Sequence, residues 1–126
     1  MNGNRLVDSN ILIYLSKKIL SLDDISDENI LLSISVITYI EAMGYSFENA
    51  KEKKSIKSLC NDLQVIKLED EIVSKTIELR QKHTIKLPDA IIAATALEND
   101  LELATRNTGD FKGIAGLKLF NPFEKK

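Results

Sequence analysis

Short apolar segments alternate along this chain with longer segments of helical periodicity. The strand candidates are rich in Val, Ile and Leu and cover residues 5–7, 31–34, 65–68, 101–105 and 117–120. Segments of helical spacing follow at 11–15, 37–44, 49–63, 69–82 and 88–97. This alternation is typical of a buried parallel sheet, because crossover helices cover both faces of such a sheet. The pattern therefore predicts an α/β fold with a mainly parallel sheet of about five strands.

Capping residues and one proline indicate where several helices begin. Ser9 or Asn10 is predicted to cap the first helix and Ser35 the second, because short polar side chains accept hydrogen bonds from first-turn N–H groups. Pro88 suits the first turn of the last helix, and the alanine-rich segment after it must pack closely. No linker, repeat or low-complexity tract interrupts the sequence, so we expect a single domain over residues 1–126.

The sequence also bears on the cellular location of the protein and on its single cysteine and histidine. No apolar run reaches the roughly 20 residues that span a bilayer, and the first residues lack the apolar core of a signal peptide. We therefore expect a cytoplasmic protein without membrane attachment. Cys60 has no cysteine partner and falls on the apolar face of its helix, which predicts a buried structural thiol. His83, the only histidine, lies in a polar turn, where we expect it at the surface.

Four acidic residues stand where folding alone would not choose a carboxylate. Asp8 closes the first apolar strand, and Glu41 falls on an apolar face of the second helix, beside Ile37, Ile40 and Gly44. Asp89 opens a nearly all-apolar helix, and Asp110 follows the fourth strand. Burying a lone carboxylate is costly unless pairing, protonation or a metal offsets the desolvation. Because hard divalent cations prefer oxygen ligands, such a group indicates a Mg²⁺ or Mn²⁺ site.

Each acid also has an ordinary structural alternative. Asp8 suits an N-cap, Asp89 a first-turn position that favours the helix dipole, and Asp110 an irregular loop. For Glu41 the alternative is a different helical phase. In open α/β sheets, however, ligands bind beyond the carboxyl ends of the strands, which is where Asp8 and residues 106–110 fall.

The charge distribution bears on nucleic-acid binding. The formal charge of −2 argues against simple electrostatic binding of RNA or DNA. Setting aside the four acids leaves 15 acidic against 17 basic residues, a balance of +2. For the lysines of helix 49–63, the alternative to phosphate binding is a solvated helix face. The basic residues available for phosphate contacts are Lys51, Lys53, Lys54, Lys57, Arg80, Lys82, Lys86 and Arg106.

Four segments resemble, in order and spacing, the motifs of PIN-domain nucleases. They are LVDSN at 6–10, IE at 40–41, LPDAIIAATA at 87–96 and TRNTGDF at 105–111. Residues 116–122 also resemble the closing strand of VapC-like toxins of type II toxin–antitoxin systems. The resemblance spans nearly the whole chain. It implies a PIN-like, Rossmann-like three-layer α/β/α sandwich.

The resemblance also implies an activity and partners. It implies a Mg²⁺- or Mn²⁺-dependent ribonuclease that hydrolyses RNA phosphodiester bonds, a homodimer, and an antitoxin protein that occupies the nuclease groove. Exposed aromatic side chains are expected at Tyr45, Phe47 and Phe123, as for a partner surface. The implied site comprises Asp8, Glu41, Asp89 and Asp110 as catalytic metal ligands, with Asp110 at the most variable position, and Ser9, Asn107 and Arg106 as substrate-binding residues.

Other classes of enzyme lack their required residues here. A haloacid-dehalogenase-like phosphatase needs a second aspartate two residues after the first, and Asn10 stands there. P-loop and dinucleotide-binding enzymes need glycine patterns that Gly109, Gly113 and Gly116 do not match. Two alternatives remain open, a catalytically weak or inactive PIN-like protein-binding module and a nuclease directed at DNA.

Overall fold

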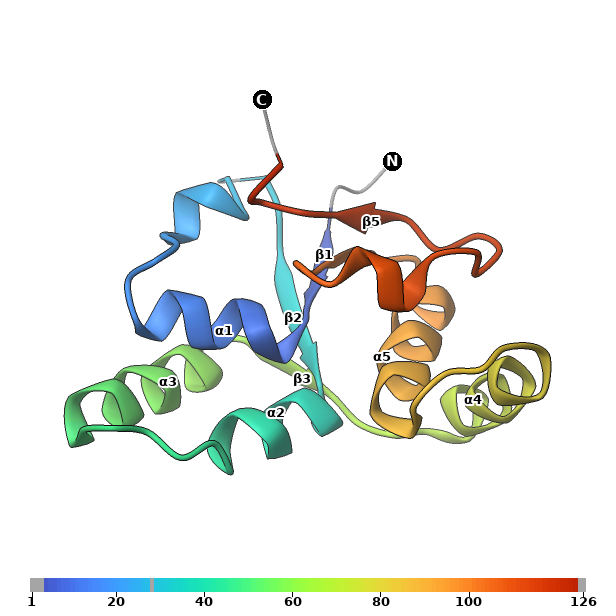
Figure 1. Ribbon diagram of the computed structural model, residues 1–126, viewed down its shortest axis with the longest axis horizontal. Coiled ribbons are helices and arrows are strands. Elements are labelled where there is room, and N and C mark those ends of the chain that lie inside the picture. Colours follow the sequence, from blue (N-terminus) through green and yellow to red (C-terminus); the bar gives the residue numbers. More distant parts are fainter. Residues whose placement is uncertain (1–3, 28, 125–126) are drawn as a thin grey trace.

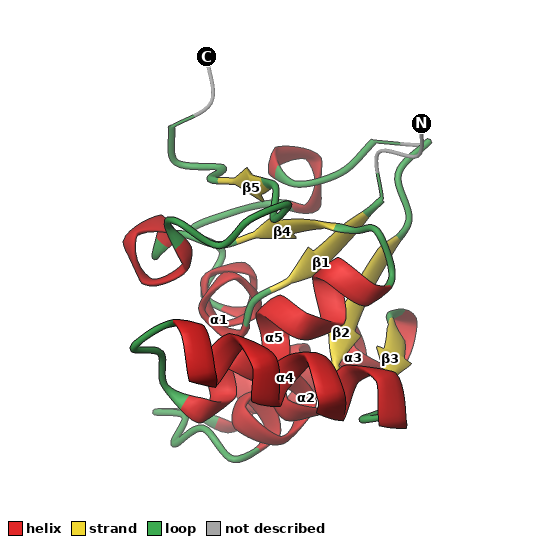
Figure 2. Cartoon of the chain, turned by 90° about the vertical axis from the view of Figure 1, so that its right-hand side faces the viewer, coloured by secondary structure: helices red, strands yellow, loops and turns green. Residues whose placement is uncertain are grey.

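The described part of the chain contains a five-stranded parallel sheet. The computed structural model describes residues 4–27 and 29–124. The strands lie in the order β3-β2-β1-β4-β5, and each neighbouring pair is parallel. Figure 2 shows them as a twisted fan, as the right-handed twist of strands requires. The predicted parallel sheet is confirmed. The strands are β1 (Arg5–Val7), β2 (Leu32–Ser35), β3 (Gln64–Ile66), β4 (Glu102–Ala104) and β5 (Leu119–Phe120).

Helices cover both faces of this sheet. In Figure 1, α1, α2 and α3 lie on one side of the strands, and α4 and α5 lie on the other. The predicted three-layer α/β/α sandwich is therefore confirmed. The α-helices are α1 (Ser9–Ser16), α2 (Val36–Met43), α3 (Ala50–Asp62), α4 (Asp70–Lys82) and α5 (Leu87–Glu98), and the short 3-10 helices are η1 (Leu22–Asp24) and η2 (Thr108–Phe111).

Side chains of the strands alternate between two cores, one on each face of the sheet. Leu6 packs with residues of α4 and α5, whereas the next residue, Val7, packs with residues of α1, α2 and α3. Leu119 and Phe120 divide between the two cores in the same way. Because both faces of the strands are covered, these short segments are almost entirely apolar in sequence.

Helix α5 is the most deeply buried helix of the sandwich. Its residues 90–96 are all buried, and four of these seven are alanines, whose small side chains let neighbouring elements approach closely. The buried hydroxyl of Thr95 donates a 2.7 Å hydrogen bond to the carbonyl oxygen of Ile91. Pro88 lies in the first turn, as predicted. In the described part of the chain, no helix is long and apolar enough to cross a membrane.

Two sequence predictions outside the sheet concern single side chains. Cys60 is buried in α3, and burial raises the pKa of its thiol, so the predicted structural thiol is confirmed. His83 directly follows α4 and is half-buried, less exposed than predicted. Its backbone N–H donates to the carbonyl oxygen of Leu79 in the last turn of the helix.

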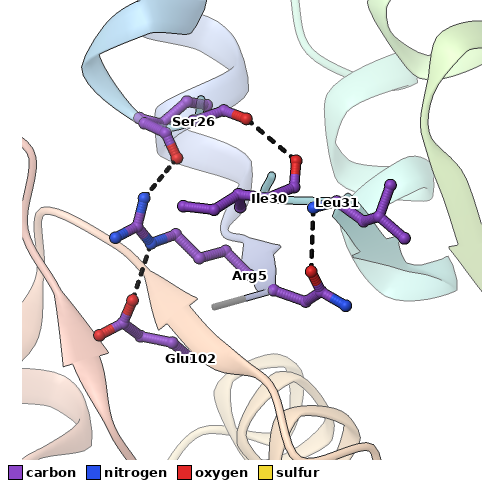
Figure 3. Close-up of polar contacts among 7 residues, drawn as sticks. Arg5, Ser26, Ile30, Leu31 and Glu102 are labelled. Carbon is purple, nitrogen blue, oxygen red and sulfur yellow. Dashed lines mark hydrogen bonds and ion pairs between the residues drawn. The ribbon is translucent and has the colours of Figure 1, made fainter. Parts of the chain in front are cut away.

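Arg5 joins several parts of the chain at the amino end of β1 (Figure 3). Its Nε donates to Glu102 Oε1 at 2.7 Å, and its Nη1 donates to the carbonyl oxygen of Ile25 at 2.7 Å. The guanidinium carbon also lies 3.8 Å from the ring centroid of Phe120. Arg5 thus connects β1 with β4, β5 and the segment after η1, at the opposite end of the strand from Asp8.

The prediction of Ser9 or Asn10 as the N-cap of α1 is wrong, whereas the structural alternative stated for Asp8, an N-cap, is confirmed. Asp8, rather than Ser9 or Asn10, caps the helix, because β1 ends at Val7 and the helix begins at Ser9. Asp8 is the single residue between the two elements and keeps the extended backbone that an N-cap requires. The cap predicted for α2 is confirmed, since the Ser35 side chain accepts a hydrogen bond from the N–H of Ile37.

The apolar face expected for α2 is only partly buried, because Ile37 is half-buried and packs against the core that contains Leu6. The buried residues of this helix are Thr38 and Ala42, whereas Ile40 is 58% exposed and Glu41 and Gly44 are also exposed. The apolar residues of α2 itself are distributed over nearly all sides of the helix, so their spacing does not define which face is buried. The small side chains of Thr38 and Ala42 allow the closer approach to the rest of the protein.

The aromatic residues predicted at the surface differ in exposure. Tyr45 is 43% exposed and Phe123 is 38% exposed, as expected. Phe47 is half-buried, so this part of the prediction is wrong. Phe47 follows α2 in the connection to α3 and packs against the core that contains Val7, with Tyr45 edge-on at 4.9 Å between ring centroids.

Candidate active site

The four predicted acids lie at the carboxyl ends of three adjacent strands or on elements that border them. Asp8 follows β1, the central strand, and Asp110 lies in η2, which follows β4. Glu41 lies in α2, directly after β2, and Asp89 is in the first turn of α5. Because the strands are parallel, their carboxyl ends share one edge of the sheet. The fold therefore brings together residues that are up to about 100 positions apart in the sequence.

Asp8 is the buried member of the group, with 5% of its surface exposed. Its Oδ1 accepts a hydrogen bond from the N–H of Ser9 at 2.8 Å. Its Oδ2 accepts one from the Thr105 hydroxyl at 2.7 Å and one from Asn10 Nδ2 at 3.3 Å. Burial raises the pKa of Asp8 despite these donors, with a further increase from the charge of Asp110. The carboxylate is held in one orientation at an electrostatic cost.

The negative charges of the other three acids affect the pKa of Asp89. Its pKa is raised to about 6, first by burial and then by the negative charges of Asp8, Asp110 and Glu41. The charge of Lys86 opposes this increase. Asp89 is therefore close enough to the other three acids for their charges to act on it, although all four come from different strand connections. This mutual repulsion is what a shared cation would relieve.

The side chains differ in how far they extend into solvent. Asp89 is half-buried, and Glu41 and Asp110 are exposed. Over residues 4–27 and 29–124, no three acidic, histidine or cysteine side chains converge closely enough to enclose a metal ion. The donor chemistry nevertheless fits a hard divalent cation, because all four groups offer carboxylate oxygens and the exposed two are free to turn. Asn10 adds a buried amide oxygen, Oδ1, that has no hydrogen-bond partner among the described residues.

Two hollows border these acids. One, of about 490 Å³, is lined by Asp89 and Asp110 together with Arg80, Lys86 and residues 84–85 and 109. The other, of about 470 Å³, is lined by Glu41 together with Ser9, Asn10, Ile13, Tyr14, Lys17, Tyr45 and Asn107. We call the first the basic hollow and the second the tyrosine hollow. Ser9 and Asn107, both predicted from the sequence, thus line the tyrosine hollow.

Arg106 is held by aromatic side chains. Its Nη1 donates a 2.9 Å hydrogen bond to the Tyr14 hydroxyl, and its guanidinium carbon lies 4.4 Å from the ring centroid of Phe123. The rings of Tyr14 and Phe123 meet edge-on, with 5.1 Å between their centroids. Arg106 itself is exposed. Its planar cation is therefore fixed in place while it remains open to a ligand.

The predicted basic residues are distributed unevenly around the site. Arg80 and Lys86 line the basic hollow, whereas Lys82 forms an ion pair with Glu78 at 3.2 Å. The lysines at 51, 53, 54 and 57 are exposed on α3 and line neither hollow. These four lysines therefore match the alternative of a solvated helix face.

Thr105 and Asn10 contribute to the site but were not predicted as functional residues. Thr105 is 0% exposed and bridges Asp8 to the N–H of Asn107, which donates to the Thr105 hydroxyl at 3.0 Å. Asn10 donates to the same carboxylate oxygen of Asp8. A polar residue at the buried end of the fourth strand candidate was the available signal, because a buried hydroxyl needs a partner.

Comparisons with known proteins agree with this arrangement. The model of the PIN domain family matches residues 5–117. The chain is 35% identical to a chain of a toxin–antitoxin complex from Klebsiella pneumoniae, with a TM-score of 0.75 and coverage of 96% of this chain and 99% of that one. For VapBC-1 from nontypeable Haemophilus influenzae the identity is 25%, the TM-score 0.76 and the coverage 96% and 99%.

A third relative supports the fold alone. VapBC2 from Rickettsia felis, bound to a DNA fragment from their promoter, is 22% identical, with a TM-score of 0.78 and coverage of 94% of this chain and 98% of that one. No curated protein sequence matches the chain. Given the family match over residues 5–117 and toxin–antitoxin complexes as its neighbours in fold, the chain belongs to the PIN domain family.

Proposed function

We propose that this protein is a metal-dependent ribonuclease that hydrolyses RNA phosphodiester bonds, with Asp8, Glu41, Asp89 and Asp110 as its catalytic acids. The observation that carries the proposal is the pKa of Asp89, raised to about 6 by burial and by the other three charges. A perturbed carboxyl group surrounded by like charges at the carboxyl edge of an α/β sheet supports a functional site. Separate structural roles for the four acids would not explain why the charges of three of them raise the pKa of the fourth.

Mg²⁺ or Mn²⁺ is the cofactor that we propose for this site. The four carboxylates would hold the ion, since hard cations of this kind take oxygen ligands and retain water. When bound, such an ion lowers the pKa of a water molecule and stabilises negative charge on the phosphate. The proposal extends to Asp110, although its exposed position in η2 makes it the least constrained of the four.

The side chains around the acids suit a phosphodiester substrate. Asp8 is fixed by three hydrogen-bond donors, so its oxygens keep their direction when a substrate binds. The pKa of about 6 belongs to Asp89 in the metal-free protein, and a bound cation would favour the charged form of Asp89 that holds the ion. Arg80 and Lys86 share the basic hollow with Asp89, where their charges would attract the phosphates of an RNA strand.

Three further residues are proposed to bind substrate. Ser9 and Asn107 line the tyrosine hollow and offer a hydroxyl and an amide. Arg106 offers an exposed guanidinium that is already oriented by Tyr14 and Phe123. Such groups contact phosphates and sugars without reading the base sequence. They would position the RNA strand rather than select it.

We also propose a biological setting, as the toxin of a toxin–antitoxin pair in the cytoplasm. The supporting observation is the 35% identity to a chain of a toxin–antitoxin complex over 96% of this chain. In this setting the protein is a homodimer, and an antitoxin protein occupies the nuclease groove. Sedimentation that shows only monomer would contradict the homodimer. An antitoxin should copurify with the protein and suppress its cleavage activity.

The experiment that tests the activity is cleavage of RNAs and matched single-stranded DNAs with Mg²⁺, Mn²⁺ or EDTA. The control is the double variant Asp8→Asn/Asp89→Asn. We expect metal-dependent cleavage of RNA that the double variant loses. Equal cleavage of DNA would replace the ribonuclease with a DNA-directed nuclease. Cleavage that persists in the variant would contradict the assigned site, and absence of both cleavage and metal binding would indicate an inactive protein-binding module.

A further inference from the structure

The two hollows that border the acids differ in chemistry. The basic hollow has two cationic side chains, Arg80 and Lys86, and none of its lining residues is aromatic. The tyrosine hollow has two aromatic rings, Tyr14 and Tyr45, and one cation, Lys17. A nucleic-acid strand has the same two kinds of group, charged phosphates and flat bases. The asymmetry therefore bears on how a strand would lie across the acids.

Both tyrosine rings are fixed by contacts outside the hollow. Tyr14 meets Phe123 edge-on at 5.1 Å between centroids, and Tyr45 meets Phe47 edge-on at 4.9 Å. Phe47 packs in turn against the core on that side of the sheet. Tyr45 nevertheless keeps 43% of its surface exposed. A ring that is held in place yet open to solvent loses little conformational entropy when a flat ligand stacks on it.

Cations accompany the rings. Lys17 Nζ lies 5.9 Å from the ring centroid of Tyr45 and forms a 3.4 Å ion pair with Glu52, which holds it at the end of α1. Arg106 is hydrogen-bonded to the Tyr14 hydroxyl. Sites for single-stranded nucleic acid combine aromatic rings, on which bases stack, with cations that follow the backbone. The tyrosine hollow has this composition, and its volume of about 470 Å³ is in the range of small-ligand sites, roughly 300–1,000 Å³.

We propose that the tyrosine hollow is a base-binding subsite for single-stranded RNA, in which Tyr45 and Tyr14 stack on the base of a nucleotide beside the scissile phosphate. This inference rests on the ribonuclease function proposed above. It adds the path that the RNA strand takes across the protein. The base of one nucleotide lies between α1 and the α2–α3 connection, and the strand continues over the acids toward Arg80 and Lys86. Glu41, which lines the tyrosine hollow, marks the passage from the base to the acidic group.

The test is RNA binding by an Asp8→Asn protein, which separates binding from cleavage. The probe is a labelled single-stranded oligoribonucleotide followed by fluorescence anisotropy. Tyr45→Ala should weaken binding about tenfold, the scale of one lost base–aromatic stack, whereas Tyr45→Phe keeps the ring and the affinity. Tyr39→Ala is the matched control, because Tyr39 is 38% exposed on α2 and lines neither hollow.

A second measurement identifies the base itself. Replacing one nucleotide at a time by an abasic nucleotide should weaken binding to the protein at one position, and Tyr45→Ala should show no further loss there. If Tyr45→Ala binds like its parent, or if the abasic series is flat, the base-binding subsite is overturned. If binding depends on the ring and on one base but the native protein cleaves no RNA, the ribonuclease proposal fails and the subsite stands. The abasic series needs no Tyr45 variant, so it decides even if Tyr45→Ala fails to fold.

Discussion

The Thr105 hydroxyl donates a 2.7 Å hydrogen bond to Asp8 Oδ2 across the neighbouring strands β4 and β1. Both residues are buried, and the same hydroxyl accepts a hydrogen bond from the N–H of Asn107 at 3.0 Å. Thr105 therefore links the most buried acid of the site to the connection that carries Asp110. A partner of this kind fixes the direction of a carboxylate that is meant to bind an ion.

Thr105→Val should impair the site while leaving the fold intact. The substitution keeps the shape of the side chain but removes one donor to Asp8 and the acceptor for Asn107 N–H. We expect an affinity for Mn²⁺ about 10- to 100-fold lower, as when a group that orients a metal ligand is lost. Calorimetric titration with Mn²⁺ measures this. Thr105→Ser keeps the hydroxyl and should bind the ion like the native protein; equal affinity in the valine variant would contradict the assigned role of Thr105.

Mg²⁺ or Mn²⁺ should raise the melting temperature, because an ion that binds only the folded state stabilises it by mass action. At a free concentration of about 100 times Kd, the gain in stability is about 2.7 kcal/mol. In EDTA, Asp8→Asn should be neutral or stabilising, since it removes one of four mutually repelling charges and asparagine caps a helix as well as aspartate does.

The controls for this measurement distinguish site and structure. Asp23→Asn changes an exposed acid in η1, outside the acidic group, and should leave the response to metal unchanged. Asp8→Asn should reduce that response. A large destabilisation of Asp8→Asn in EDTA would mean that capping of α1 is the main role of Asp8. A native protein without any shift at saturating metal would count against the site.

The sequence alone predicted the sheet because strand burial has a direct signature. Residues such as Leu6 and Val7 are consecutive and both apolar, which is favourable only where each face of a strand meets its own core. The acids near the strand ends followed from the same reasoning, since ligands of open α/β sheets bind beyond the carboxyl ends of the strands. The fold could therefore be predicted together with the position of Asp8 and residues 106–110 at the carboxyl ends of the strands.

The parts that could not be predicted depend on contacts that local spacing does not reveal. α2 is apolar on nearly all sides, so the orientation of Glu41 was decided by the close packing of Thr38 and Ala42. The contact between Arg106 and Tyr14 joins residues 92 positions apart, and no periodicity relates them. The tyrosine hollow could not be predicted for this reason, although the sequence analysis singled out Ser9, Tyr45 and Asn107, which line it.

Arg5→Met should destabilise the protein without changing its site. The substitution removes the ion pair with Glu102 and the hydrogen bond to the Ile25 carbonyl (Figure 3), together with the contact with the Phe120 ring. It leaves the Glu102 carboxylate and a carbonyl oxygen without their donor, at a cost of about 1–3 kcal/mol. Thermal and urea unfolding measure the loss. Glu102→Gln, which keeps the other two contacts of Arg5, should cost less; an equal or smaller loss in Arg5→Met would show that the cluster contributes little.

Stability without metal should fall as the pH rises through the range in which Asp89 loses its proton. The pKa of Asp89 is about 6 in the folded protein, whereas an unperturbed aspartate has a pKa of about 3.9. Between these values the folded state binds more protons than the unfolded state. The contribution of Asp89 to stability is therefore fully present below about pH 4 and is lost as the pH rises through about 6. Asp8, whose pKa is also raised, acts in the same direction.

The measurement is urea unfolding of the native protein and Asp89→Asn, in EDTA, at about pH 4.5 and about pH 7.5, on either side of the raised pKa. Because Asp89 is half-buried, solvent screening reduces its effect, and we expect the native protein to lose on the order of 1 kcal/mol more than Asp89→Asn. Saturating Mg²⁺ should remove most of this difference, since a bound cation offsets the repulsion that otherwise favours the proton. Identical pH profiles for the two proteins in EDTA would mean that Asp89 does not experience the charges of Asp8, Asp110 and Glu41, and the case for a shared acidic site would lose its main support.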